Sequence, residues 1–337
     1  MPRYRVQVRD QASQSPWTMP AFAVGGAVLA LTAAANQLAA WRAERRQPPI
    51  GGFLNADGVR LHYIDKGNGP PVVLIHGTGA MIQDFSLSIL HGLTRRHRVI
   101  VFDRPGYGYS ERPRGRRWTP EAQAHVIRAG LRQLGLERPL IVGHSYGASV
   151  ALSYGALFPA EIRGIVLMAG YYFPTFRPAI PLFGALATPV LGDLFRYTVA
   201  PVLFRAATPA ILGKTFAPNP APSVFIENFP FDLAYRPSQI RAAADDVAGL
   251  RPWARRMRHI YPAIRPATVI LSGMVDQIVD PNRHSTRLHR MIPGSILRLI
   301  PGVGHMLHHV RPDLVLEAVS NFDPTKSKAP EAPALVP

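Results

Sequence analysis

The five residues Gly143–Gly147 restrict the possible folds more than any other stretch of the chain. Their sequence is Gly-His-Ser-Tyr-Gly, a G-x-S-x-G pattern, and they lie between the apolar run Leu140–Val142 and the helical run Tyr146–Leu157. A serine on a tight turn from a strand into a helix projects its hydroxyl clear of the sheet, and flanking glycines permit the close packing of that turn. The start of the helix also favours negative charge that develops nearby. The pattern therefore predicts that Ser145 is a nucleophile at the end of a strand.

Short apolar runs alternate with helical patterns over most of the chain. Nearly continuous apolar runs are typical of strands buried on both faces of a parallel sheet. Arg60–Ile64 alternates apolar and polar residues instead, so we expect it in an edge hairpin. Helical patterns cover Pro120–Leu134, Tyr146–Leu157 and Asp313–Phe322. This alternation predicts an α/β fold with a mostly parallel sheet and helices on both faces. The expected buried strands are Val72–Ile75, Val99–Phe102, Leu140–Val142, Ile165–Ala169, Val269–Leu271 and Leu297–Ile300.

The stretch 171–250 interrupts this alternation. It is rich in Pro, Phe, Leu and Tyr, carries few charges before Arg236, and is too long for a loop in a compact domain. We expect an inserted helical cap over the carboxyl edge of the sheet, and extra core helices remote from any site are the alternative. Because ligand pockets are mostly apolar, this composition favours an apolar substrate. The phenylalanines concerned are Phe173, Phe176, Phe183, Phe195, Phe204, Phe216, Phe225 and Phe229.

A serine hydroxyl needs a base to accept its proton, and histidine is suited to that near neutral pH. The chain has 12 His, of which His305 is best placed, because it ends a Gly-rich stretch directly after the last apolar run. His308 and His309 follow closely and are the alternatives. The chain has no H-E-x-x-H motif, so a metal role for these histidines is disfavoured, and we expect neither a metal nor a cofactor.

The base must be oriented by a carboxylate on its other ring nitrogen. Asp276 follows the run Val269–Leu271 through Ser-Gly-Met-Val and is the expected partner of His305. Asp280 lies four residues further on, before a proline, where an aspartate ordinarily starts a turn or caps a helix. The order Ser145, Asp276, His305 is the serine–acid–histidine order expected on this kind of sheet.

The negative charge that develops on the substrate needs hydrogen-bond donors. His76-Gly77-Thr78-Gly79 comes directly after a predicted strand, and we expect the backbone N–H groups of Thr78 and Tyr146 to converge on the oxyanion. A plain turn is the alternative for this loop. Asp103 opens a second Gly-rich loop that we expect to fix the neighbouring backbone, and no G-x-G-x-x-G accompanies it, so a dinucleotide site is unsupported. The residues expected to support the site without touching substrate are His76, Gly77, Gly79, His144 and Asp103.

These motifs together resemble the α/β-hydrolase superfamily over about residues 52–322. They are, in chain order, H-G-T-G, D-R-P-G-Y-G-Y-S, G-H-S-Y-G, S-G-M-V-D and G-V-G-H. The resemblance implies an eight-stranded, mostly parallel sheet with a cap between its sixth and seventh strands. Haloalkane dehalogenases and epoxide hydrolases of this superfamily use an aspartate nucleophile where this chain has Ser145, so the resemblance is greater to the esterase, lipase and carbon–carbon-bond hydrolase branches.

The expected function is therefore hydrolysis of carboxylic esters through an acyl-enzyme, with a small apolar ester as substrate. Other reactions of the same triad are alternatives, namely carbon–carbon-bond hydrolysis, acyl transfer, peptide hydrolysis or cofactor-free perhydrolysis. A non-catalytic binding protein with this fold is a further alternative.

The N-terminal segment differs from the rest of the chain. No charged residue lies between Gln11 and Trp41, and Ala21–Ala40 is mostly Ala, Val, Leu and Gly. Twenty helical residues rise about 30 Å, the thickness of the hydrocarbon core of a bilayer. Trp17 and Trp41 lie near the two ends, as expected at membrane interfaces. We expect a single membrane anchor over about residues 20–41. A cleaved signal peptide and a surface-lying or packed helix are the alternatives, and the side of the membrane is open.

Composition restricts the remaining classes of function. Apolar residues make up 47% of the chain and charged residues 18%, which excludes an intrinsically disordered protein. The net charge of +17 is spread without zinc-finger spacing or RNP-like sequences. We therefore expect attraction to anionic lipid, or simply a solvated basic surface, rather than binding to nucleic acid. The absence of Cys excludes disulfides and a thiol nucleophile.

We expect the chain to be divided into five parts. They are the N-terminal segment 1–47, the first part of the core 48–170, the cap 171–250, the second part of the core 251–323 and a disordered tail 324–337.

Overall fold

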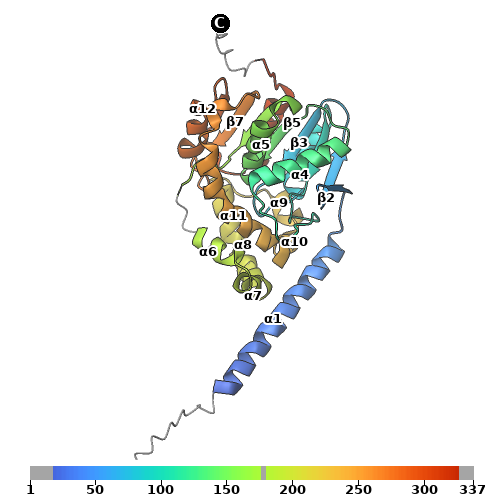
Figure 1. Ribbon diagram of the computed structural model, residues 1–337, viewed down its shortest axis with the longest axis vertical. Coiled ribbons are helices and arrows are strands. Elements are labelled where there is room, and N and C mark those ends of the chain that lie inside the picture. Colours follow the sequence, from blue (N-terminus) through green and yellow to red (C-terminus); the bar gives the residue numbers. More distant parts are fainter. Residues whose placement is uncertain (1–17, 176–179, 326–337) are drawn as a thin grey trace, which may run out of the picture.

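An eight-stranded sheet forms the centre of the computed structural model, which describes residues 18–175 and 180–325 (Figure 1). The strand order is β1-β2-β4-β3-β5-β6-β7-β8. β2 pairs antiparallel with both β1 and β4, and all other neighbours are parallel. The predicted tail lies almost entirely outside the described residues. The strands are β1 Gly52–Ala56, β2 Val59–Lys66, β3 Pro71–Ile75, β4 Arg98–Phe102, β5 Leu140–His144, β6 Gly164–Met168, β7 Thr268–Gly273 and β8 Ile296–Ile300.

The predicted mostly parallel sheet is confirmed, and each predicted apolar run corresponds to one of its strands, although the run Ile165–Ala169 extends one residue beyond β6. β5, β6 and β7 are buried along their whole length, as expected for central strands covered on both faces. β8 differs from the prediction of a buried strand, because it lies at the edge of the sheet and only Ile300 is fully buried. The predicted edge hairpin is formed by β1 and β2.

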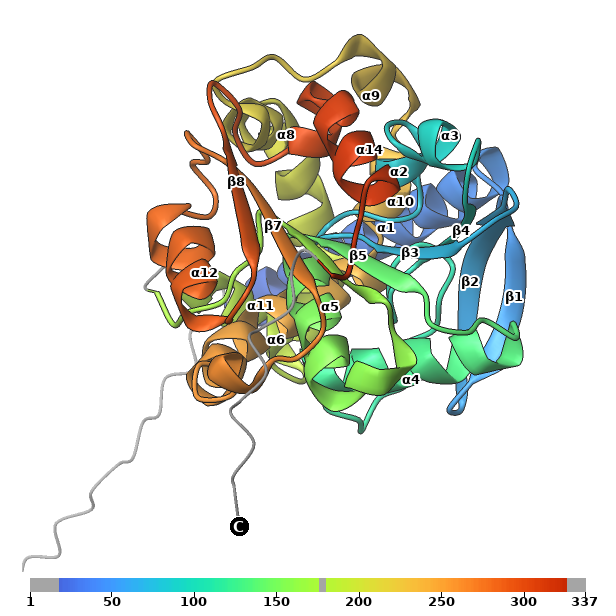
Figure 2. The ribbon, with the colours of Figure 1, turned by 90° about the horizontal axis from the view of Figure 1, so that it is seen from above.

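Helices cover both faces of the sheet (Figure 2). One apolar cluster joins the sheet to α4 (Pro120–Gln133) and α5 (Tyr146–Leu157), and the other joins it to α3 (Leu90–Leu93) and α14 (Pro312–Ser320). The predicted helices at residues 120–134, 146–157 and 313–322 correspond to α4, α5 and α14. The remaining short elements of the core are α2 Gln83–Ser86, η1 Pro159–Glu161, η2 Tyr261–Ala263, η3 Asn282–Thr286, α12 Arg287–Met291 and α13 Leu307–Val310.

An inserted helical cap lies between β6 and β7 and covers the carboxyl ends of the strands (Figure 1). Its last helix continues past residue 250 and joins the core, since Trp253 and Met257 are buried in the cluster that contains α4 and α5. Nearer its start, Ile240 and Ala244 pack against Leu186 of the first cap helix. The cap helices are α6 Ile180–Ala187, α7 Leu191–Tyr197, α8 Ala200–Phe216, α9 Ser223–Asn228, α10 Phe231–Ala234 and α11 Pro237–Met257.

The N-terminal helix α1 (Thr18–Arg46) projects from the folded domain beside the cap (Figure 1). One stripe near its end is buried, consisting of Asn36, Ala40 and Ala43 at helical spacing. Side chains on the preceding turns are exposed, including Val24 and Leu31, which are 63% and 70% accessible. Over Ala23–Arg46 the helix is long and apolar enough to cross a membrane, a property that signal sequences share.

Candidate active site

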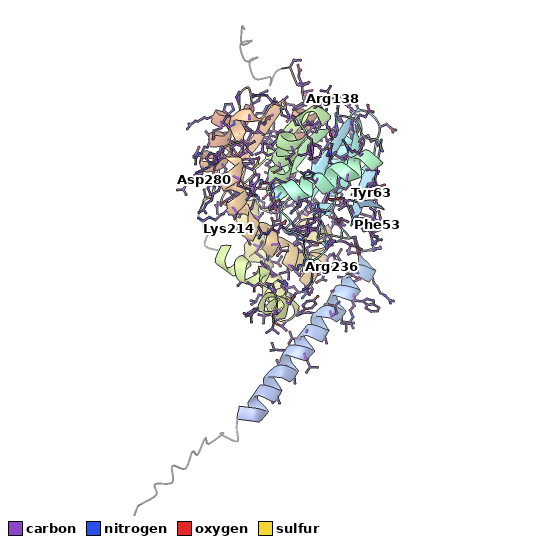
Figure 3. The ribbon with its side chains drawn as sticks, in the orientation of Figure 1. Phe53, Tyr63, Arg138, Lys214, Arg236 and Asp280 are labelled. Atoms are coloured by element: carbon purple, nitrogen blue, oxygen red, sulfur yellow. The ribbon has the colours of Figure 1, made fainter. Side chains whose placement is uncertain are left out.

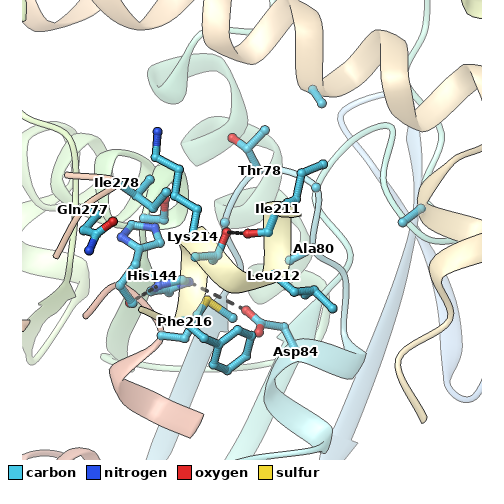
Figure 4. A pocket seen from close by; sticks show the side chains of 18 of the residues that line it. Thr78, Ala80, Asp84, His144, Ile211, Leu212, Lys214, Phe216, Gln277 and Ile278 are labelled. Carbon is cyan, nitrogen blue, oxygen red and sulfur yellow. Dashed lines mark hydrogen bonds and ion pairs between the residues drawn. The ribbon is translucent and has the colours of Figure 1, made fainter. Parts of the chain in front are cut away.

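A cavity of about 1040 Å³ lies between the cap and the carboxyl edge of the sheet (Figure 4). Ser145, Asp276, His305 and Thr78 all line it, so the structure brings together residues that are up to 227 positions apart in the chain (305 − 78). The opposite wall comes from the cap and is mostly apolar. Its lining residues include Phe204, Ile211, Leu212, Phe216, Phe225, Phe229 and Phe231.

Ser145 occupies a strained turn between β5 and α5. Its backbone has φ 54° and ψ −116°, a region that side-chain-bearing residues rarely adopt. The flanking glycines make this turn possible. A Cβ on Gly143 would lie 2.2 Å from the Gly147 carbonyl oxygen, and a Cβ on Gly147 would lie 2.0 Å from the Ile75 carbonyl oxygen. Both positions therefore exclude any larger residue, and Ser145 lines the cavity.

His305 and Asp276 form a buried pair beside Ser145. His305 Nδ1 lies 2.8 Å from Asp276 Oδ2, and Asp276 Oδ1 accepts hydrogen bonds from the N–H groups of Ile278 and Val279 at 2.7 and 2.9 Å. Burial opposes the charge of this carboxylate, but His305 and the two N–H donors together hold the pKa of Asp276 below its ordinary value. Since a carboxylate only accepts hydrogen bonds, the proton lies on His305 Nδ1, which leaves Nε2 as the basic nitrogen.

The alternative acid and base residues make other contacts. Asp280 Oδ1 accepts a hydrogen bond from the Arg283 N–H at 2.9 Å, the capping role expected for an aspartate before a proline, and its side chain is 51% exposed. His308 and His309 each place Nε2 3.0 Å from Asp84 Oδ1. Burial lowers the pKa of His308 to about 3, so that ring is a poor proton acceptor near neutral pH.

The loop after β3 is oriented by Arg104, which is fully buried. Its Nε donates to the His76 carbonyl at 2.8 Å and its Nη2 donates to the Gly77 carbonyl at 3.0 Å. In a trans peptide the carbonyl and the following N–H point in opposite directions, so the Thr78 N–H is directed away from Arg104. The loop lies against Ser145, because a Cβ on Gly77 would be 3.0 Å from Ser145 Cβ.

Tyr146 begins α5, so its N–H belongs to the first turn, whose N–H groups have no partner within the helix. The expected pair of donors, Thr78 and Tyr146, thus lies on the two segments that flank Ser145. The Tyr146 ring points the other way, into the core, where burial raises the pKa of its hydroxyl well above the ordinary value.

The other predicted supporting residues also hold the loops of the site. Asp103 Oδ1 accepts from the Ile82 N–H at 2.8 Å, and its Oδ2 lies 2.7 Å from His62 Nδ1, so it joins the loops after β3 and β4 to β2. His144 Nε2 lies 3.1 Å from the His305 carbonyl oxygen. Gly79 has φ +76°, which a glycine adopts without strain.

Two carboxylates at the site are not predicted from the sequence. Asp246 of α11 receives hydrogen bonds from Arg104 Nη1 at 2.6 Å and from Arg112 Nη1 at 2.9 Å, and thereby compensates the buried charge of Arg104. Asp84 of α2 is buried beneath the nucleophile loop, and His144 Nδ1 lies 3.7 Å from its Oδ2 (Figure 4). Neither residue belongs to a motif, and only the fold places them beside the site.

Asp84, His308 and His309 offer three ligand atoms within 4.8 Å of one another, a spacing that would suit a metal ion. In this structure, however, both imidazole Nε2 atoms lie at hydrogen-bonding distance from one oxygen of Asp84. Since the carboxylate can only accept, each ring donates to it. The arrangement therefore corresponds to a hydrogen-bonded network behind His305.

His76 provides a pH-dependent contribution to stability. Its Nδ1 donates to the Gly77 carbonyl at 2.8 Å and its Nε2 accepts from the Arg104 N–H at 3.0 Å, an arrangement that only the neutral ring allows. Burial, with Arg104 close by, lowers the pKa of His76 to about 4 from its ordinary 6.5. Between these values the unfolded chain binds the additional proton, so stability decreases as the pH falls.

We expect the His76 contribution to the free energy of unfolding to fall by about 2 kcal/mol between pH 7 and pH 5. Urea titrations at the two pH values measure the total decrease, to which other buried histidines add. In His76→Gln the glutamine amide does not ionise, so the decrease in the free energy of unfolding should be smaller by about 2 kcal/mol. An equal decrease in both proteins would contradict a neutral His76.

Comparison with known proteins agrees with this architecture. The family model of the alpha/beta hydrolase fold matches residues 70–312. The haloalkane dehalogenase 2 of Mycobacterium tuberculosis is 27% identical over 268 residues, which cover 77% of this chain and 90% of that protein. The 2-hydroxy-6-oxo-2,4-heptadienoate hydrolase of Pseudomonas putida is 27% identical over 276 residues, with 76% and 90% covered. The structure of an esterase from Exiguobacterium antarcticum superimposes with a TM-score of 0.67 at 23% identity, covering 80% of this chain and 98% of that one.

Proposed function

Because the chain belongs to the α/β-hydrolase fold family, we propose that it is a serine hydrolase that cleaves carboxylic esters. One relative is named as a hydrolase and another as a haloalkane dehalogenase. The observation that carries the proposal is the convergence of Ser145 and the His305–Asp276 pair on one cavity, with 2.8 Å between the imidazole and the carboxylate. A nucleophile, a base and an orienting acid are the groups that acyl transfer requires.

The proposed reaction begins when Ser145 Oγ attacks the ester carbonyl carbon while His305 Nε2 accepts the hydroxyl proton. The N–H groups of Thr78 and Tyr146 stabilise the oxyanion, and Asp276 stabilises the imidazolium. The ester C–O bond then breaks, and His305 gives its proton to the departing alkoxide. Water, deprotonated by the same imidazole, hydrolyses the acyl-enzyme and regenerates Ser145. This sequence uses only groups of the chain and water.

Carbon–carbon-bond hydrolysis is the second candidate, and one relative is named 2-hydroxy-6-oxo-2,4-heptadienoate hydrolase. The same serine, histidine and oxyanion donors would serve that reaction. The apolar cap wall favours an ester with an apolar acyl group, and product analysis distinguishes the two reactions. Dehalogenation is disfavoured, although a relative is named for it, because that reaction in this superfamily uses an aspartate where this chain has Ser145.

The cap residues that line the cavity indicate which substrates the cavity would prefer. Phe204, Phe216, Phe225 and Phe229 line the cavity. The other phenylalanines considered from the sequence differ: Phe173 is buried in the core, and Phe195 is 48% exposed on the surface. Phe176 and the side chain of Phe183 lie outside the described residues. The cavity wall thus uses part of the aromatic residues of the cap, and its volume far exceeds that of an acetyl group.

We expect kcat/KM for p-nitrophenyl esters to rise from acetate to medium acyl chains by about tenfold in total, since each buried CH₂ contributes up to about 0.8 kcal/mol. Ile211 lines the cavity and is 41% exposed, so Ile211→Ser should fold and should flatten this series. Ile260, which is 42% exposed outside the cavity, provides the matched control Ile260→Ser. A flat or falling series in the unchanged protein would contradict an acyl-binding cap.

We further propose that α1 is a retained membrane anchor. A signal peptide is removed before the protein acts, whereas this helix makes specific contacts with the folded domain. Asn36 Nδ2 donates to the carbonyls of Tyr197 and Thr198 at 2.9 and 2.7 Å, and Glu44 Oε1 lies 2.8 Å from Arg236 Nη1. Figure 3 shows Arg236 where the end of α1 meets the domain. These contacts support a helix that stays attached to the cap.

A further inference from the structure

The cap presents an apolar surface to solvent on α7 and the first turns of α8. Its large side chains are between 37% and 79% exposed, and they include consecutive apolar residues that a soluble surface would not ordinarily gather. We call this the α7–α8 apolar surface. It consists of Val190, Leu191, Leu194, Phe195, Val199, Val202 and Leu203.

Contacts with α1 hold this surface at a defined position along the axis of α1. The Asn36 side chain is 6% exposed and donates both of its described hydrogen bonds to carbonyls at the end of α7. Ala40 and Ala43 continue the buried stripe, and the Tyr109 hydroxyl donates to the Gln47 carbonyl where α1 ends. The position of α1 in a bilayer would therefore fix the position of α7.

The depth of the α7–α8 apolar surface in the bilayer follows from the geometry of α1. If the apolar stretch Ala21–Ala40 spans the hydrocarbon core, Asn36 lies four residues before its end, about 6 Å inside the boundary. Helices that bind in the membrane interface bury their apolar face by about 5–10 Å. The α7–α8 apolar surface therefore lies at the depth that such helices occupy. Arg42, Arg45 and Arg46 follow on exposed positions, at the level of anionic headgroups.

We propose that the cap docks into the bilayer through the α7–α8 apolar surface, with the lipid membrane as its partner. The inference rests on the proposed anchor and on the proposed ester hydrolysis, and it adds the source of the substrate. α8 separates the membrane from the cavity, because Leu203 is 61% exposed on the outer side whereas the adjacent Phe204 lines the cavity. Ile211, Leu212 and Thr215 continue the inner side. The substrate class is accordingly an acyl ester dissolved in the bilayer, which reaches Ser145 along this wall.

The experiment uses the absence of cysteine from the chain, which allows a single fluorophore at a chosen position. Full-length Leu194→Cys and Leu203→Cys, each labelled with an environment-sensitive nitrobenzoxadiazole, are reconstituted into vesicles of zwitterionic and anionic phospholipid. Leu31→Cys reports on the anchor, and Leu157→Cys, 43% exposed at the far end of α5, is the matched control. We expect lipids with a nitroxide high on the acyl chain to quench labels at positions 194 and 203, and lipids with a nitroxide near the end of the acyl chain to quench the label at position 31. Neither lipid should quench the label at position 157.

Quenching at position 31 without quenching at 194 and 203 would overturn the docking proposal and leave the anchor intact. Loss of quenching at all these positions would overturn both. A blue shift at 194 and 203 without lipid quenching would assign the surface to a second copy of the chain and would equally overturn the proposal. Hydrolysis of soluble p-nitrophenyl butyrate by the unchanged protein tests the proposed chemistry separately.

The effect on substrate access is tested with the double variant Leu194→Glu/Leu203→Glu. We expect kcat/KM for a long-chain ester presented in vesicles to fall by about tenfold or more, since two charges oppose burial in the interface. Hydrolysis of soluble p-nitrophenyl butyrate should change by less than about twofold, because neither side chain lines the cavity. Leu157→Glu should alter neither rate. Equal losses on both substrates would overturn the proposed route.

Discussion

Replacement of Ser145 by alanine is expected to lower kcat for an activated ester by about 10⁴-fold or more. The side chain is small and the strained backbone of the turn is held by Gly143 and Gly147, so the fold should persist. The substitution removes the oxygen that would form the proposed acyl-enzyme, while the cavity and the proposed oxyanion donors remain. Steady-state kinetics with p-nitrophenyl butyrate measure the effect, and circular dichroism verifies the fold.

Ser149 provides a matched control on the same helix. It is fully buried in α5, and its Oγ donates to the Tyr171 carbonyl at 2.9 Å. Ser149→Ala should reduce stability by about 1 kcal/mol through the lost hydrogen bond and change kcat little. A fluorophosphonate should label the unchanged protein and Ser149→Ala but not Ser145→Ala. Turnover near the unchanged level in pure Ser145→Ala would exclude Ser145 as the nucleophile, and an inert unchanged protein would favour a non-catalytic binding role.

The central strands and the helix behind Ser145 could be predicted because their signals are local. A buried parallel strand leaves a continuous apolar run, and α5 covers the predicted residues Tyr146–Leu157. The Gly143–Gly147 turn could also be predicted, because its glycine requirement comes from close contacts within the turn and with the adjacent strand β3 that any such turn makes. The half-exposed β8 could not, since an apolar run does not show which strand lies at the edge of the sheet.

The contacts of the supporting residues show more clearly what a single sequence cannot predict. Arg104 lies in a recognisable Gly-rich loop, and the sequence predicts that this loop fixes the neighbouring backbone. The partner that compensates its charge, Asp246, lies 142 positions away on the last cap helix. Similarly, Asp84 lies 224 positions from His308. Such pairs depend on tertiary packing, and a single sequence contains no spacing from which they could be read.

The packing of α1 against the cap is a further feature that the sequence does not predict. An uncharged, Ala-rich stretch predicts a membrane helix and leaves a signal peptide as an alternative. The spacing of Asn36, Ala40 and Ala43 marks one face, yet small residues also occur throughout this helix. Only the carbonyls at the end of α7 show that Asn36, a weak point for membrane insertion by composition, has partners on the cap.

The two nearby aspartates allow a second large effect to be tested with matched substitutions. Asp276→Asn is expected to lower kcat by about 10²–10⁴-fold. The carboxylate accepts the His305 Nδ1 proton, whereas an amide NH₂ at that place would donate and force the proton onto Nε2, where the base must be free. The amide oxygen can still accept from the N–H groups of Ile278 and Val279, so the turn should survive.

Asp280→Asn makes the same chemical change four residues away. Its amide oxygen can still accept the Arg283 N–H, and the side chain is half exposed, so we expect kcat to stay within about threefold of the unchanged value. Parallel kinetics at pH 7.5, with urea titrations to compare stability, give the ranking. Since the pKa of Asp276 is held below its ordinary value, its charge is lost only in strong acid, and the difference between the variants should persist across the neutral range. The reverse ranking would assign the orienting role to Asp280 and would require the segment after β7 to rearrange before the enzyme acts.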